Sequence, residues 1–224
     1  MRLITRADDD MYQAANLADK LGRAAALVDQ LVERYEENWQ DPEVSFQYAL
    51  VLMATLQNVR SDVEGHRRYS ATMEALGEVL VAEPDHWLAR YCRARLRALV
   101  PAGFGGYTMF VDHERTMANA DLTELADRQS RVPWQPYFAC THLLQAFVAG
   151  QSEDWAAVRR CIDAAAQRPH GPVGPHALGA ILCEPFVALY PLVDGDQRAV
   201  VGRLMATMFP DLPVVATALT EPVR

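Results

Sequence analysis

The residue types that most often carry out chemistry in proteins are scattered along this sequence. The six histidines stand at positions 66, 86, 113, 142, 170 and 176, and the four cysteines at positions 92, 140, 161 and 183. Neither the C-x-x-C nor the H-E-x-x-H spacing of common zinc sites occurs. Consecutive residues of a helix point in different directions, so the Asp-His-Glu run at 112–114 cannot present three ligands to one ion. The sequence therefore predicts no metal and no cofactor.

The usual signatures of covalent catalysis are also missing. There is no G-x-S-x-G turn and no recognisable Cys–His signature, and paired carboxylates such as Glu36 and Glu37 stand at expected helix ends, where capping explains them. The glycine-rich stretch VPAGFGGYTMF, residues 100–110, follows a helical pattern and contains no lysine. A phosphate-binding loop would follow a strand, so a connection between helices is the better interpretation. We predict no catalytic residue, and an enzyme is the less favoured class.

The strongest candidate for a binding surface is the helical stretch DHWLARYCRARLRALV, residues 85–100. At 100° per residue, its arginines at 90, 93 and 97 fall within about 60° of each other, beside a strip that contains an aromatic pair. Arginine grips carboxylates through two hydrogen bonds and stacks on aromatic rings. The strip therefore predicts contact with an acidic or carboxylate-bearing partner. Its predicted contact residues are Trp87, Arg90, Tyr91, Arg93 and Arg97.

Three more polar residues on flanking helices extend this candidate surface with neutral hydrogen-bonding groups: Gln47, His142 and Gln145. A purely structural alternative stays open for the arginines. They could instead pair with acids on neighbouring helices, such as Asp112 or Glu114.

Composition and charge exclude several classes of partner. The chain has 224 residues, of which 50% are hydrophobic, and a net charge of −8, so no basic field favours nucleic acid or an anionic membrane. No apolar run approaches the roughly 20 residues that span a bilayer. The first ten residues, MRLITRADDD, turn acidic after six, unlike a signal peptide. We expect a cytoplasmic protein whose cysteines are buried and reduced.

The elements that must position these residues are helices. Apolar residues recur at helical spacing in stretches such as AALVDQLVERYEEN, and no convincing alternation of a strand is present. Prolines at 42, 84, 169 and 210 end such stretches with a period of about 42 residues, with one member missing or displaced, for which Pro133 is the candidate. We predict an all-α chain of five antiparallel helical hairpins. Their helices are 8–21 with 23–39, 43–58 with 66–82, 85–100 with 107–129, 134–149 with 153–168, and 175–192 with 196–209.

One hairpin carries a more specific pattern. In GQSEDWAAVRRCIDAAAQRPHGP, residues 150–172, Ala157, Cys161, Ala164 and Pro169 fall at offsets 0, 4, 7 and 12, and Ser152, Glu153 or Asp154 is expected to cap the helix. With the preceding helix, this pattern resembles a tetratricopeptide repeat. The resemblance covers residues 137–169 as a motif and residues 43–210 as an architecture, and it implies a short right-handed superhelix whose first helices line a concave groove. We expect a single helical-repeat domain over residues 1–224.

That resemblance favours a non-catalytic adaptor or scaffold that holds a protein or peptide, with a homo-oligomer also compatible. The alternative is a small enzyme or small-ligand binder that uses the repeats as a scaffold. A closed apolar pocket with converging polar groups would favour this alternative, and an open groove would favour the adaptor.

Overall fold

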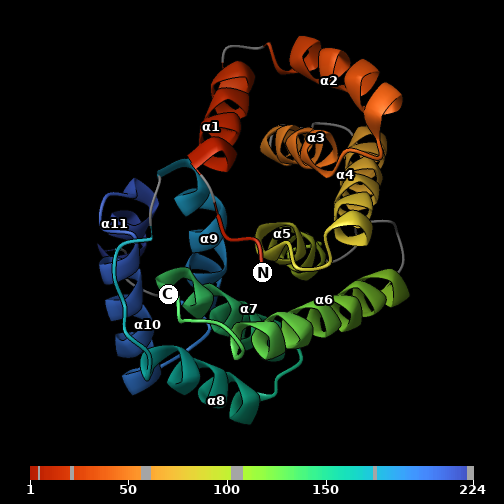
Figure 1. The fold of residues 1–224 in the computed structure, drawn as a ribbon. Coiled ribbons are helices and arrows are strands. Elements are labelled where there is room, and N and C mark those ends of the chain that lie inside the picture. The colour runs from red at the N-terminus through yellow and green to blue at the C-terminus, as the bar shows by residue number, and fades with distance from the viewer. Residues whose placement is uncertain (5, 21–22, 57–61, 102–107, 174–175, 221–224) are drawn as a thin grey trace. The chain divides into compact units, whose positions relative to one another are not determined.

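The computed structural model describes residues 1–4, 6–20, 23–56, 62–101, 108–173 and 176–220. Over these residues the protein is all-α (Figure 1), and the single isolated β-bridge that they contain joins Arg2 to His86. Within the same residues, every helix is too short or too polar to span a lipid bilayer. The helices are α1 (Arg6–Lys20), α2 (Ala24–Asn38), α3 (Pro42–Leu56), α4 (Asp62–Ala82), α5 (Trp87–Ala98), α6 (Thr108–Gln129), the short 3-10 helix η2 (Pro136–Phe138), α7 (Ala139–Gln151), α8 (Trp155–Ala166), α9 (His176–Leu189), α10 (Gly195–Met208) and α11 (Pro213–Thr220).

The all-α class expected from the sequence is confirmed, and α1 to α10 coincide with the ten expected helices to within a few residues. The largest shift is at α7, which begins five residues later than expected because η2 occupies the preceding turn. Helix α11 was not predicted. Gly22 and most of the glycine-rich stretch, residues 102–107, lie outside the described residues. The five-hairpin superhelix stays a prediction.

The chain divides into two compact units. The first unit comprises Met1–Arg93 with Val100–Asp112, and the second comprises Ala94–Leu99 with residues 113–224. The single domain expected over residues 1–224 stays a prediction, and the two units are described separately below.

Helix α3 is the central element of the first unit, and it packs against α1, α2 and α4 (Figure 1). Its sequence PEVSFQYALVLMATL is apolar on nearly every side, and eleven of its fifteen residues are buried. A helix of this composition is stable in water only when other helices cover all its faces. The expected pairs α1 with α2 and α3 with α4 both pack together. The two polar residues of α3 that are not fully buried, Glu43 and Gln47, lie in its first two turns.

In the second unit, α7 packs against α8, α9 and η2, and α10 packs against α8, α9 and α11. Helix α8 begins after Asp154, whose side chain accepts a hydrogen bond of 2.9 Å from the backbone N–H of Ala157. This cap is one of the three that the sequence predicted, and it satisfies one of the unpaired N–H groups at the helix start.

The register expected for α8 is wrong by one residue. The tetratricopeptide pattern placed Ala157, Cys161 and Ala164 against the partner helix, but all three side chains are only half-buried. The buried stripe of this helix consists of Val158, Ile162 and Ala165. The buried face of α8 therefore carries two bulky residues and one alanine, whereas the repeat pattern predicted two alanines and a cysteine.

Candidate functional site

The segment of residues 1–4, whose Arg2 forms a β-bridge with His86, lies against the start of α5 in the first unit. The backbone N–H of Arg2 donates to the carbonyl of Asp85 at 2.9 Å, and the N–H of Trp87 donates to the carbonyl of Arg2 at 3.2 Å. The first N–H groups of a helix have no partner within the helix. The carbonyl of Arg2 supplies an acceptor for one of them. Both the N–H and the carbonyl of Arg2 are therefore hydrogen-bonded to the main chain around the start of α5.

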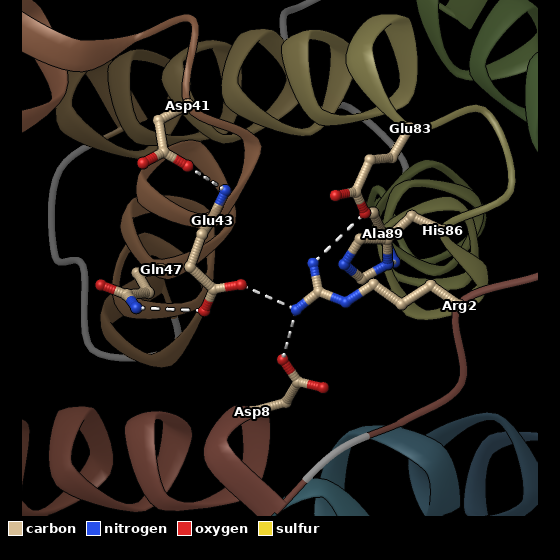
Figure 2. Close-up of polar contacts among 8 residues, drawn as sticks. All are labelled: Arg2, Asp8, Asp41, Glu43, Gln47, Glu83, His86 and Ala89. Atoms are coloured by element: carbon tan, nitrogen blue, oxygen red, sulfur yellow. Dashed lines mark hydrogen bonds and ion pairs between the residues drawn. The ribbon is translucent and has the colours of Figure 1, made fainter.

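The guanidinium of Arg2 contacts three carboxylates that come from three different parts of the unit (Figure 2). Its Nη2 lies 2.8 Å from Oε2 of Glu43 and 3.5 Å from Oδ1 of Asp8, and its Nη1 lies 3.3 Å from Oε2 of Glu83. Asp8 is on α1, Glu43 is in the first turn of α3, and Glu83 directly follows α4. We call Arg2, Asp8, Glu43, Glu83 and His86 the arginine cluster.

The cluster carries more negative than positive charge. Burial by itself lowers the pKa of Arg2, but the hydrogen bond to Glu43 and the charges of Asp8 and Glu43 outweigh it, so this pKa is raised. Asp8 is 2% exposed, whereas the side chains of Glu43 and Glu83 are 42% and 38% exposed. The guanidinium therefore contacts one buried carboxylate and two carboxylates that water reaches.

Neighbouring residues fix the orientation of Glu43 (Figure 2). Its backbone N–H donates to Oδ1 of Asp41 at 2.9 Å, which makes Asp41 the cap of α3. Its Oε1 accepts a hydrogen bond of 3.1 Å from Nε2 of Gln47, one turn further along the helix. Gln47 in turn accepts one from Arg34 at 3.3 Å. Gln47, which the sequence predicted as a partner contact, thus positions a carboxylate of the cluster.

His86 lies beside Arg2 and is 1% exposed (Figure 2). Its Nδ1 accepts a hydrogen bond of 3.2 Å from the backbone N–H of Ala89, so His86 caps α5 and the proton of the neutral ring is on Nε2. Burial and the positive charge of Arg2 lower the pKa of His86 to about 3. The ring lies 4.4 Å from that of Phe46, centroid to centroid. The buried Nε2 has no hydrogen-bond partner among the described residues.

The aromatic part of the predicted arginine strip is in the core. Trp87 and Tyr91 are 1% and 0% exposed, and their rings stack with centroids 4.9 Å apart. Arg90 is 6% exposed and donates to the carbonyl of Pro84 at 2.9 Å, and Arg93 is half-buried. In this conformation the two rings stabilise the first unit and offer no surface to a partner.

Arg97 belongs to the second unit, where it joins α5 to α6. Its Nη1 lies 2.7 Å from Oδ2 of Asp121, and its Nε lies 3.4 Å from Oε2 of Glu114. Glu114 is an acid named in the structural alternative for the strip, and for Arg97 the geometry favours that alternative. Arg95, on the same helix, is ion-paired with Glu184 of α9.

His142 and Gln145 meet on α7 in the second unit. Nδ1 of His142 lies 3.2 Å from Oε1 of Gln145, and the imidazole is nearly parallel to the ring of Trp134 at a centroid distance of 6.5 Å. Burial lowers the pKa of His142, the hydrogen bond with Gln145 raises it, and the charge of Arg168 lowers it, with a net decrease. The eight predicted contact residues are therefore divided between the two units, with Arg97, His142 and Gln145 in the second.

In the part of the chain that the structure describes, no group of side chains is arranged to bind a metal ion, and the cysteines form no disulfide bond. No three His, Cys, Asp or Glu residues lie together there in a metal-binding arrangement. All four cysteines are free thiols, and Cys92, Cys140 and Cys183 are buried. Burial raises the pKa of Cys183 to about 12, which keeps its sulfur protonated and unreactive.

The arginine cluster is the feature that sequence reasoning missed. Arg2 and Glu83 are separated by 81 residues, and no sequence motif links the members of the cluster. At the level of the sequence, the acidic residues after position 6 indicate only that the N-terminus is unlike a signal peptide. Comparison of the chain with family models, with curated proteins and with solved structures gave no match.

Proposed function

We propose that the protein is a non-catalytic interaction module whose first unit binds an extended peptide segment of a partner protein. The observation that carries this proposal is the placement of residues 1–4: the helical scaffold already holds an extended segment in cis, by its main chain and by one side chain. The main-chain contacts are a carbonyl of Asp85 that accepts and an N–H of Trp87 that donates. This pair is what one residue of an adjacent strand requires.

In each of three expected hairpins the two helices pack together, α1 with α2, α3 with α4 and α7 with α8, and this is consistent with the proposal. We keep the tetratricopeptide-like superhelix as part of it, because helices of such arrays provide rigid walls along which peptides bind. The acidic partner inferred from the arginine strip has less support, since Trp87 and Tyr91 are buried and Arg97 is neutralised by two carboxylates.

The test uses a synthetic peptide with the sequence Met-Arg-Leu-Ile-Thr and a fluorophore at its C-terminal end. In the wild-type chain the tethered segment competes with the peptide at an effective concentration on the order of millimolar. Arg2→Ala weakens the tethered segment, so the full-length variant should bind the peptide at least tenfold more tightly than the wild type, as measured by fluorescence anisotropy.

Arg6→Ala is the matched control, because the side chain of Arg6 is 91% exposed and lies 3.9 Å from Asp10, which is 64% exposed. This variant should bind the peptide as weakly as the wild type. Circular dichroism verifies that both variants keep their helical signal. If folded Arg2→Ala protein shows no saturable binding, the segment is only a structural tie and the proposed function is wrong.

A further inference from the structure

The arginine cluster is built around a guanidinium rather than around an extended backbone alone. We infer, on the basis of the proposed function, that the partner segment carries an arginine which takes the place of Arg2, so that residues 1–4 act as an internal competitor for the site. The partner is thus a basic, arginine-bearing segment in extended conformation.

The charges of the cluster require a cation at this position. One guanidinium faces three carboxylates, of which Asp8 is almost completely buried. Removing the cation would take away the guanidinium that contacts all three carboxylates, one of them almost completely buried, which is unfavourable. A segment that takes the place of residues 1–4 is therefore expected to bring a cation of its own.

The geometry selects arginine over lysine. Two different nitrogens of one planar group contact the acids, Nη1 on the side of Glu83 and Nη2 on the side of Glu43 and Asp8. The compact ammonium of lysine lacks this fork and cannot contact the three carboxylates in the same way. The guanidinium carbon also lies 5.9 Å from the centre of the Phe46 ring, a position in which a weakly hydrated cation gains further attraction.

His86 supplies a second observation that points to a ligand. Its Nε2 is buried and carries a proton, yet has no acceptor among the described residues. A buried donor without a partner is costly and uncommon, and it is often explained by function. Arg2 and His86 are paired in the β-bridge. A partner segment longer than residues 1–4 would therefore bring further backbone carbonyl groups close to the imidazole of His86. Such a carbonyl would satisfy the imidazole.

Access to the cluster is provided by its exposed acids. The side chain of Arg2 is 24% exposed, and Glu43 and Glu83 are exposed by more than a third. The arginine of a partner can thus contact these two carboxylates before Arg2 has left. Direct exchange of one guanidinium for another keeps a cation beside the three carboxylates throughout.

The experiment compares four peptides on the full-length Arg2→Ala variant: the Met-Arg-Leu-Ile-Thr peptide and versions with lysine, citrulline or alanine in place of the arginine. Citrulline has the shape of arginine without the charge. We expect at least tenfold weaker binding for the lysine peptide and a larger loss for the citrulline and alanine peptides. Raising the salt from 50 to 500 mM should weaken the arginine peptide most.

Site variants test the same contacts from the other side. In the Arg2→Ala background, Glu43→Gln and Glu83→Gln should each weaken the arginine peptide at least fivefold, whereas Glu74→Gln, an exposed position on α4, should have no effect. If Arg2→Ala loses its helical signal, Arg2→Lys replaces it as the background.

The outcomes separate the two proposals. If all four peptides bind equally well, the arginine requirement is wrong while the proposed peptide-binding function stands. If no peptide binds to the folded variant, both are wrong. Equal binding by the Glu43→Gln and Glu74→Gln variants would also overturn the inference.

Discussion

The neutral, buried imidazole of His86 gives the first unit a predictable dependence on pH. The pKa of a histidine in an unfolded chain is about 6.5, and burial beside Arg2 lowers that of His86 to about 3 in the folded protein. Between these two values, the unfolded chain binds a proton that the folded chain does not. Stability is therefore fully present above pH 6.5 and is lost as the pH falls toward 3.

The size of the effect follows from the two pKa values. From pH 7.0 to pH 4.5, the folded imidazole stays neutral while the unfolded one becomes almost completely protonated. At about 1.4 kcal/mol per pH unit over this window, the free energy of unfolding should decrease by about 2.5 kcal/mol because of His86 alone.

The matched variant is His86→Asn. Asparagine is also a good helix cap and can accept the hydrogen bond from the N–H of Ala89, but it does not titrate. Urea denaturation followed by circular dichroism at several pH values should show a decrease between pH 7.0 and 4.5 that is about 2.5 kcal/mol smaller in the variant. All other titrating groups are common to both proteins and cancel in this difference. An identical pH dependence of the two proteins would refute the assignment of His86 as a buried neutral group.

Four further substitutions test the packing. Asp121→Ala removes the closer carboxylate of Arg97 and should lower the free energy of unfolding by about 2–3 kcal/mol in urea denaturation; an unchanged midpoint would contradict the ion pair. Ala165→Leu should overpack the core side of α8 and cost about 1–3 kcal/mol in thermal melts, whereas Ala164→Leu, half-exposed, should cost less than about 0.5 kcal/mol. The reverse order would restore the register expected from the repeat pattern. Gly77→Ala, inside α4 with free space around the added methyl group, should raise stability by about 0.5–1 kcal/mol, and a lower melting temperature would show that the space is filled.

The helices could be predicted because they depend on local information. Apolar spacing defines each buried stripe, and prolines such as Pro42 and Pro84 limit where a helix extends. The register of α8 was wrong because it was taken from the resemblance to a repeat rather than from the apolar residues, which by themselves place Val158 and Ile162 inside. Helix α11 was missed because its eight residues are too few to show a period.

The strip on α5 illustrates where local information ends. Angular clustering correctly places its arginines near each other on one helix, but it does not reveal what covers them. Asp121, 24 residues further along the chain, forms an ion pair with Arg97, and the carbonyl of Pro84 accepts a hydrogen bond from Arg90. Only the tertiary structure distinguishes an exposed cationic surface from arginines that stabilise the fold.

The arginine cluster required the opposite kind of information. Arg2 meets Glu43 across 41 residues and Glu83 across 81 residues, and a single arginine near the start of a sequence has no period or motif. The net charge of −8, which at the sequence level only excluded nucleic acid and anionic membranes, now agrees with the local chemistry. An acidic surface attracts a basic segment over long distances and lowers the local concentration of acidic competitors. The long-range electric field of the acidic protein and the three carboxylates of the cluster thus both favour the proposed basic segment. Added salt should slow the association of this segment before it weakens the contacts inside the cluster.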